Sequence, residues 1–289
     1  MDAPRYCYRH PDRETGLSCS ECGRPICYEC MTPAPVGIRC PEHSGKPQGI
    51  QKVTRAAERA VTGVGGRRMN AVTIALIAAN VAVALVELAS GSNASFTNNS
   101  IFENGSLFAS GYVNAAGQPL GVAHGEWWRL FTAMFLHASF FHLAVNMYSL
   151  YFVGSIMEQV IGRWRFLLLY LASGLAGSAG ALVLSPLTPT VGASGAIFGV
   201  LGGLFILERR RHIATGGQVA GLIVLNLVIT FAFSTSISVG GHVGGLIGGM
   251  ALMLALLQFR RSALYSVASV LALTVVSLVV AYAKVRNYQ

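Results

Sequence analysis

The sequence predicts an all-α polytopic membrane protein with a small cysteine-rich module at its N-terminus. Hydrophobic residues make up 53% of the 289 residues, and only 11% are charged, against roughly 25% in a typical soluble domain. All six cysteines precede residue 41, and the long apolar runs begin at residue 69. We therefore expect a module over 1–45, a basic linker over 46–69, a membrane core over 70–262 and a last helix with a tail over 263–289.

Seven apolar runs are expected to form membrane-spanning helices. The first covers 69–89, and at 1.5 Å per residue a helix of that length crosses about 30 Å of hydrocarbon. The others are expected at about 131–157, 166–184, 194–207, 219–233, 242–259 and 264–283. Most of the chain should therefore lie in the lipid bilayer.

The basic residues predict the orientation of these helices. With the N-terminus inside, 18 of the 21 Lys and Arg residues lie on the inner side, and only Arg129, Lys284 and Arg286 lie outside. Arg129 follows Trp127 and Trp128, a combination that favours the membrane–water interface. Because the +9 charge is scattered between apolar runs, we expect no nucleic-acid partner. We expect a bacterial plasma membrane, with the N-terminus in the cytoplasm.

The N-terminal module contains four pairs of Cys or His residues, and two residues separate the members of each pair. Eight such side chains are what two tetrahedral zinc sites require. Clustered cysteines with interleaved histidines favour metal over disulfides, and therefore a reducing compartment. The segment is short and has few large apolar residues, so metal binding would provide its folding energy. The candidate ligands are Cys7, His10, Cys19, Cys22, Cys27, Cys30, Cys40 and His43.

The pattern of the module resembles small treble-clef and B-box zinc fingers. In B-box folds the ligand pairs alternate between two metals, and sequential pairing is the alternative that stays open. A protein partner of the module is one role that such a fold would allow. Alternation would place Cys7, His10, Cys27 and Cys30 on one zinc ion, and Cys19, Cys22, Cys40 and His43 on the other.

The chemistry is expected at Ser194 and His242, which lie in two glycine-rich apolar runs. Polar and ionisable groups are costly inside a membrane, so they are functional candidates by default. We interpret Ser194 as a nucleophile and His242 as the base that takes its proton and returns it to the leaving amine. Because we expect no carboxylate near this face, a dyad is favoured over a triad. The glycines around both residues predict close helix packing.

Ser194 should lie below the outer membrane surface. From Ser194 to Leu207 the fourth run has 14 residues, about 21 Å of helix against about 30 Å of hydrocarbon. The loop before it must then enter the membrane, which is tolerated only where protein or a water-filled cavity surrounds the backbone. The sequence thus predicts a cavity open to the outer side.

His142 and Asn146 are candidates for stabilising an oxyanion. They lie four residues apart, so a helix presents them on one face. With the backbone N–H of Ser194 at a helix start, they would supply hydrogen bonds to a developing negative charge. The alternative is that the pair makes hydrogen bonds that hold the helices together.

Four motifs resemble those of the rhomboid family of intramembrane serine proteases, in the same order and on the same helices. They are Trp128-Arg129, His142-x3-Asn146, Gly192-Ala193-Ser194-Gly195 and Gly241-His242-x2-Gly245. The resemblance covers about residues 70–260 and implies a six-helix bundle, here followed by a seventh helix. It also implies that Ser194 is the nucleophile and His242 the base, and that His142 and Asn146 stabilise the oxyanion.

The resemblance implies substrates that are single-span membrane proteins, and it implies no catalytic cofactor. The first alternative is a non-catalytic rhomboid-like protein that binds transmembrane clients. The second is a transporter that uses intramembrane histidine as a relay. A transporter predicts an internal repeat, and the two halves of the sequence show none.

Overall fold

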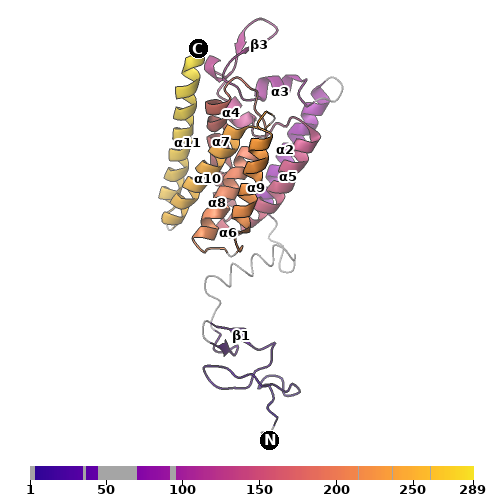
Figure 1. Ribbon diagram of the computed structural model, residues 1–289, viewed down its shortest axis with the longest axis vertical. Helices are drawn as coiled ribbons and strands as arrows, with labels where there is room; N and C mark the ends of the chain where they lie inside the picture. Colours follow the sequence, from indigo (N-terminus) through magenta and orange to yellow (C-terminus); the bar gives the residue numbers. More distant parts are fainter. Residues whose placement is uncertain are drawn as a thin grey trace. The chain divides into compact units, whose positions relative to one another are not determined.

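A computed structural model describes residues 4–34, 37–44, 70–91, 96–213, 215–235, 237–260 and 262–289. They belong to two compact units, Met1–Arg55 and Ala56–Gln289, and each unit is described by itself (Figure 1). The expected basic linker at 46–69 falls outside the described residues. The domain boundaries at 45 and 69 therefore stay predictions.

The N-terminal unit is built from short loops around a small core. Strands β1 (Thr32–Pro33) and β2 (Ile38–Arg39) pair antiparallel. Isolated bridges join Tyr6 to Glu14 and Ser18 to Pro25. The buried core contains one large aliphatic side chain, Ile26, and five of the six cysteines: Cys7, Cys19, Cys27, Cys30 and Cys40.

The second unit is helical, as the sequence predicts (Figure 1). A short antiparallel ribbon, β3 (Tyr112–Val113) with β4 (Pro119–Leu120), and one turn of 3-10 helix, η2 (Val122–His124), lie in the long loop after the first helix. The α-helices are α2 (Ala71–Ser90), α3 (Ser100–Gly105), α4 (Arg129–Thr132), α5 (Phe140–Ser149), α6 (Ser155–Ile161), α7 (Arg163–Leu184), α8 (Ser194–Arg209), α9 (Gln218–Ala232), α10 (Val239–Gln258) and α11 (Ala263–Val285).

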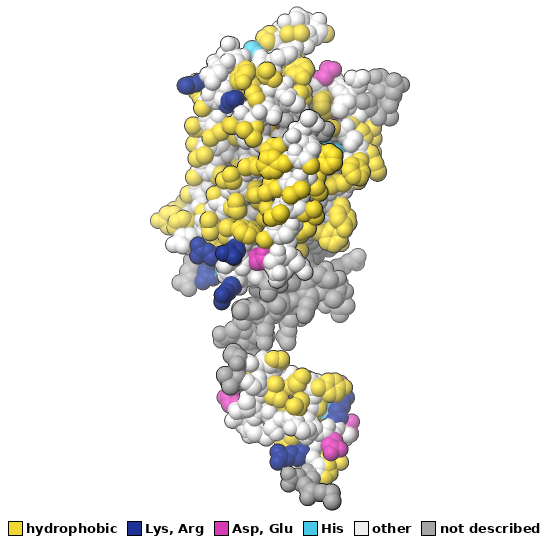
Figure 2. All heavy atoms as spheres, viewed as in Figure 1, with side chains coloured by type: hydrophobic (Ala, Val, Ile, Leu, Met, Phe, Trp, Pro, Cys, Tyr) yellow, Lys and Arg dark blue, Asp and Glu magenta, His cyan; other side chains and the backbone are white. Residues whose placement is uncertain are grey.

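Each of the seven predicted runs contains a helix. By length and composition, five described helices can cross a membrane: α2, the continuous helix Phe140–Ile161, α7, α10 and the helix from Ala263 to Tyr288, which ends in the 3-10 turn η4 (Arg286–Tyr288). Helix α8 has 16 residues and α9 has 15. A π-helical segment, η3 (Leu150–Gly154), joins α5 to α6. The protein is an integral membrane protein, and Figure 2 shows the broad hydrophobic surface over these helices.

The predicted start of the second span at residue 131 is wrong. The long helix begins at Phe140, because Ser139 caps it by accepting a hydrogen bond from the backbone N–H of His142. The residues before it form only the single turn α4 and a set of tight turns. The sixth run also begins earlier than expected, since Ser238 caps α10 three residues before Gly241.

Glycines bring α8 and α10 into backbone contact, as predicted. A side chain at Gly245 would overlap the carbonyl oxygen of Gly195, and one at Gly249 would overlap that of Gly199. The sequence reasoning did not anticipate that α7 joins the same packing. A Cβ at Gly177 would lie 2.9 Å from the carbonyl oxygen of Gly241. Helices α7, α8 and α10 therefore form the tightly packed centre of this unit.

Arg129 is held inside the helical unit instead of being exposed at its surface. Its side chain is fully buried, and its Nη1 donates to the carbonyl oxygens of Glu103 and Ser106 at 2.7 and 2.8 Å. Its Nε donates to Glu126 Oε2 at 2.7 Å. A buried guanidinium needs such partners, and here they fix the long loop against α4.

Candidate active site and metal sites

Ser194 and His242 lie side by side although 48 positions separate them in the sequence. Ser194 is the first residue of α8, and His242 lies in the first turn of α10. The distance from Ser194 Oγ to His242 Nε2 is 2.8 Å, a normal hydrogen bond. The close packing of α8 on α10 creates this contact, since their glycines leave no side chains between the two helix starts.

Two residues that the sequence reasoning did not identify hold the His242 ring. Phe198, one turn along α8, stacks on it with ring centroids 4.1 Å apart and planes at 18°. Thr230 on α9 places Oγ1 2.7 Å from His242 Nδ1. A signal for Thr230 was present in the sequence, because Asn226 and Thr230 are polar residues four apart within an apolar helix.

His142 and Asn146 both approach the loop that leads into Ser194. A Cβ at Gly192 would lie 2.8 Å from His142 Nε2 and 3.5 Å from Asn146 Nδ2. Gly192 has φ +125°, a conformation that favours glycine, so both space and backbone require it there. Asn146 is buried, and its Nδ2 has no hydrogen-bond partner among the described residues. A buried donor of this kind is expected to have a function.

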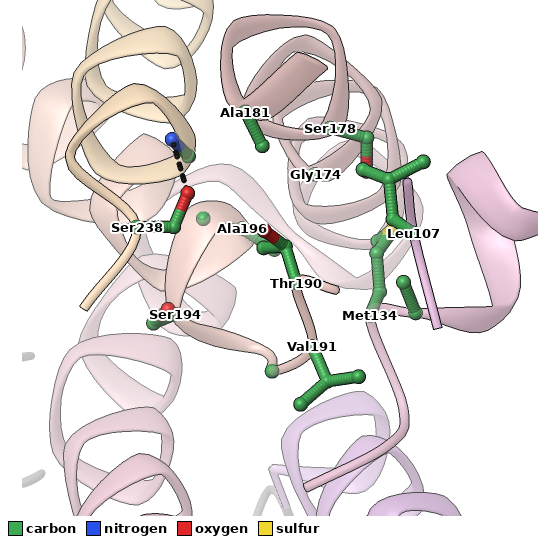
Figure 3. A pocket seen from close by; sticks show the side chains of 15 residues that line it. Leu107, Met134, Gly174, Ser178, Ala181, Thr190, Val191, Ser194, Ala196 and Ser238 are labelled. Carbon is green, nitrogen blue, oxygen red and sulfur yellow. Dashed lines mark hydrogen bonds between the residues drawn. The ribbon is translucent and has the colours of Figure 1, made fainter. Parts of the chain in front are cut away.

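The loop 185–193 packs against other parts of the chain, which satisfies its backbone. Thr190 pairs with Leu107 in an antiparallel bridge, and the N–H of Gly192 donates to the carbonyl oxygen of Ala133 at 2.9 Å. Beside this loop is a cavity of about 30 Å³, enough for a water molecule. Its lining includes Ser194 and Ser238 (Figure 3). A cavity therefore adjoins the candidate nucleophile.

Two buried ionisable residues, Glu87 and His137, lie near His142. The rings of His137 and His142 are 5.1 Å apart, and Glu87 Oε2 on α2 lies 3.4 Å from the backbone N–H of His137. Glu87 and His137 are both fully buried. A carboxylate is thus closer to the candidate oxyanion residues than the sequence suggested. It is not the partner of His242, however, whose Nδ1 faces Thr230.

The Cys and His residues of the N-terminal unit form two groups that could hold metal ions. Within each group, the ligand atoms all lie within 4.8 Å of one another. The Cys and His pairs thus come together in alternation along the chain, and not in sequence. The groups are Cys7, His10, Cys27 and Cys30, and Cys19, Cys22, Cys40 and His43.

Distances within these groups lie around those of a tetrahedral ion, with sulfur–nitrogen distances from 3.2 to 4.0 Å. A zinc ion about 2.3 Å from sulfur and about 2.0 Å from nitrogen separates two sulfurs by about 3.8 Å, and a sulfur from a nitrogen by about 3.5 Å. Cys22 Sγ and Cys40 Sγ are 3.8 Å apart. His10 Nδ1 lies 3.4 Å from Cys27 Sγ and 3.4 Å from Cys30 Sγ. The donor sets, three sulfurs and one nitrogen each, suit zinc.

Comparison with known proteins identifies a domain within the helical unit. Residues 124–259 match the family model described as the rhomboid domain, and this range contains all four candidate catalytic residues. The helical unit therefore contains a rhomboid domain. The chain is 45% identical over 117 residues to the "Rhomboid protease GluP" of Bacillus subtilis (strain 168). It is 41% identical over 119 residues to the "Putative rhomboid protease YdcA" of the same organism.

These matches cover only part of each protein. The match to GluP spans 39% of this chain and 23% of GluP, and the match to YdcA spans 41% and 60%. A third relative, "Inactive RHOMBOID-like protein 8" of Arabidopsis thaliana, is 32% identical over 108 residues, 37% of this chain and 31% of its own. The family thus includes both named proteases and an inactive member, so activity must be argued from the site.

Proposed function

We propose that this protein is an intramembrane serine endopeptidase that cleaves transmembrane segments of membrane proteins with a Ser-His dyad. One observation carries the proposal: the 2.8 Å contact between Ser194 Oγ and His242 Nε2. A nucleophile within hydrogen-bond reach of a base is the arrangement that nucleophilic catalysis requires. The base is oriented in turn by contacts with Phe198 and Thr230.

In the first half of the reaction, Ser194 Oγ attacks the carbonyl carbon of the scissile peptide bond. Its proton passes to His242 Nε2, and the carbonyl oxygen takes up the negative charge. The bond from carbon to the amide nitrogen then breaks, and His242 gives the proton to the leaving amine. In the second half, a water molecule gives a proton to His242 Nε2 and attacks the acyl carbon. The bond from that carbon to Ser194 Oγ then breaks, His242 returns the proton to Oγ, and the product leaves as a carboxylic acid.

Three donors would stabilise the oxyanion. The backbone N–H of Ser194 lies at the start of α8, where N–H groups have no intrahelical partner. The side-chain nitrogens of His142 and Asn146 approach the neighbouring Gly192. Donors already in place cost no reorganisation during the reaction, and the unpartnered Nδ2 of Asn146 suits that role.

The proposal extends to the membrane setting and the partners. We place the N-terminus in the cytoplasm of a bacterial cell and the cavity beside Ser194 on the outer side of the plasma membrane. Substrates are single-span membrane proteins whose helix unwinds into that cavity. The N-terminal unit binds two Zn²⁺ ions that hold its fold and serve no catalytic step, and it offers a surface to a protein partner.

Cleavage of a generic transmembrane substrate by the purified protein in detergent tests the proposal. Ser194→Ala and His242→Ala should each abolish cleavage, and the double variant should be no worse than either, because the two residues act as a unit. Ser269→Ala is the matched control. Its hydroxyl lies on α11 and donates to the carbonyl oxygen of Tyr265 in the same helix, so activity should be unchanged.

The same experiment separates a protease from a non-catalytic protein that binds transmembrane clients. A reactive Ser194 should be labelled by a fluorophosphonate, and the label should disappear in Ser194→Ala. A folded wild-type protein that is neither labelled nor active on any transmembrane substrate would support the non-catalytic alternative. Substantial cleavage by Ser194→Ala would exclude the serine mechanism.

A further inference from the structure

We propose that Thr230 is a positioning residue for His242: it holds the imidazole in the tautomer that can accept the proton of Ser194. Through this contact, the state of the catalytic pair depends on the position of α9. This inference rests on the proposed function, since it assigns the third member of the same site. The evidence is the pair of contacts that the Thr230 hydroxyl makes.

The direction of each hydrogen bond follows from the partners. Thr230 Oγ1 lies 2.7 Å from the carbonyl oxygen of Asn226 and 2.7 Å from His242 Nδ1. A carbonyl oxygen can only accept, so the single hydroxyl proton of Thr230 must point at Asn226. The Thr230 oxygen can then only accept from the imidazole. His242 Nδ1 must therefore carry a proton.

This assignment fixes the reactive nitrogen. A neutral imidazole carries one proton, so a proton on Nδ1 leaves Nε2 with a free lone pair. That lone pair faces Ser194 Oγ at 2.8 Å and can accept the hydroxyl proton. The other tautomer would carry its proton on Nε2 and could not act as the base. When His242 becomes an imidazolium, the same Nδ1–H continues to donate to Thr230.

Burial makes the contact important. Thr230 is 1% exposed and His242 is 8% exposed, so bulk water cannot readily replace a lost partner. Among the described residues, Thr230 provides the one hydrogen bond to His242 Nδ1. Removing its hydroxyl should leave the two tautomers in competition. The stacked ring of Phe198 restrains the plane of the imidazole but accepts no proton.

The position of Thr230 on α9 gives the contact a second consequence. Only three residues of α9 are buried, Val219, Ile223 and Thr230, and most of its large side chains are exposed. Of the hydrogen bonds described for α9, the contact from Thr230 to His242 is the one that joins a side chain of this helix to another helix. A displacement of the end of α9 that carries Thr230 would therefore release His242 Nδ1.

Three variants test the inference. Thr230→Val keeps the shape of the side chain and removes the hydroxyl, Thr230→Ser keeps the hydroxyl, and Val228→Ala is a control at an exposed position of the same helix. For Thr230→Val we expect kcat to fall roughly 10- to 100-fold with KM little changed, an effect of the size seen for the hydrogen-bond partners of metal-bound histidines. Thr230→Ser should recover most of the activity, and Val228→Ala should equal the wild type.

Nitrogen NMR of 15N-histidine protein supplies a readout that does not depend on activity. In the wild type, the His242 signals, assigned by comparison with His242→Ala, should show a protonated Nδ1 and an unprotonated Nε2. In Thr230→Val the chemical shifts of Nδ1 and Nε2 should become more alike, because both tautomers of His242 are then populated. Thr230→Ser should return the wild-type signature.

The outcomes distinguish this inference from the proposed function. If the wild type shows neither cleavage nor fluorophosphonate labelling, the proposed function fails, while the NMR signature still tests the contact. If the wild type is active, and Thr230→Val matches it in kcat and in the His242 signals, the inference is overturned. Loss of activity with an unchanged His242 signature would also overturn it, since Thr230 would then act only on packing.

Discussion

In the N-terminal unit the buried core consists of five cysteines around Ile26, whereas in the helical unit it consists of helices that touch backbone to backbone. The first unit has polar ligands where a soluble domain has aliphatic side chains. The second has glycines where a side chain would keep the helices apart. Different physical causes therefore hold the two cores together.

The difference shows which perturbation each unit should resist. The N-terminal unit brings eight metal-binding side chains together, so its stability should depend on an ion taken up from solution. The helical unit is stabilised by van der Waals packing and by buried hydrogen bonds within the bilayer. Treatments that remove metal should affect one unit, and substitutions that add volume should affect the other.

Metal removal should give the largest effect and sharpen this comparison. A strong chelator should unfold residues 7–43 completely, because the unit has too little apolar core to fold without metal. Cleavage of a detergent-solubilised substrate by the full chain should change less than about twofold, since the proposed catalytic residues include no cysteine. Metal analysis should give two zinc ions per chain. Circular dichroism measures the unfolding of residues 7–43, and an activity assay measures the cleavage rate.

The decisive control for this experiment is the zinc content of the isolated N-terminal segment. Fewer than one zinc ion per chain after careful preparation would refute the two-site interpretation. Complete loss of cleavage on chelation, reversed by zinc, would show that the two units are not independent.

A substitution in the glycine contacts should give the next largest effect, on the helical unit alone. In Gly245→Ala, the added methyl group would overlap the carbonyl oxygen of Gly195, so α8 and α10 must separate. We expect a loss of roughly 1–3 kcal/mol in the free energy of unfolding. Thermal unfolding in detergent measures it, and the zinc content should stay the same.

Gly221→Ala is the matched control for this substitution. Gly221 lies on α9, and a Cβ there would meet no atom within 4 Å. Alanine favours a helix over glycine by about 1 kcal/mol or less, so the control should be neutral or slightly stabilising. Equal losses in both variants would mean that helix propensity, not contact between α8 and α10, decides the result.

Asn146→Ala should give an intermediate effect that is seen in the rate and not in the fold. Its unpartnered Nδ2 faces Gly192 in the loop that leads into Ser194, so it should matter mainly in the transition state. We expect kcat to fall roughly 10- to 1,000-fold with KM little changed. Steady-state kinetics on a transmembrane substrate measures it. A rise in KM with intact kcat would assign Asn146 to substrate binding or packing instead.

The smallest effect is expected at the surface of the N-terminal unit. Arg9 pairs with Glu42 at 2.6 Å, but both side chains are solvent-exposed, and such pairs contribute little to stability. Arg9→Ala should leave the zinc content at two ions per chain, and it should shift the unfolding midpoint far less than loss of a ligand in Cys27→Ala. A comparable shift of the midpoint in Arg9→Ala and Cys27→Ala would show that surface ion pairs also stabilise this unit.

Much of the site could be predicted from sequence because its signals are local. Ser194 and His242 are polar residues in apolar, glycine-rich runs, and His142 and Asn146 have helical spacing. The structure brings the first two within 2.8 Å and directs the second two at Gly192. Thr230 and Phe198 were missed because the sequence does not show which residue they contact, although the polar pair Asn226 and Thr230 stands out within its apolar helix. Only the packing of α8, α9 and α10 creates those contacts.

The sequence by itself determined which segments are helical and which side chains could bind metal, since hydropathy and residue spacing act over short distances along the chain. Tertiary structure alone decided between alternating and sequential ligand pairs, because all eight ligands have the same local spacing and only the path of the chain brings Cys7 near Cys27. It likewise decided that Arg129 is buried. An arginine next to tryptophan has the same local pattern whether it faces lipid or, as here, donates to the carbonyl oxygens of a distant loop.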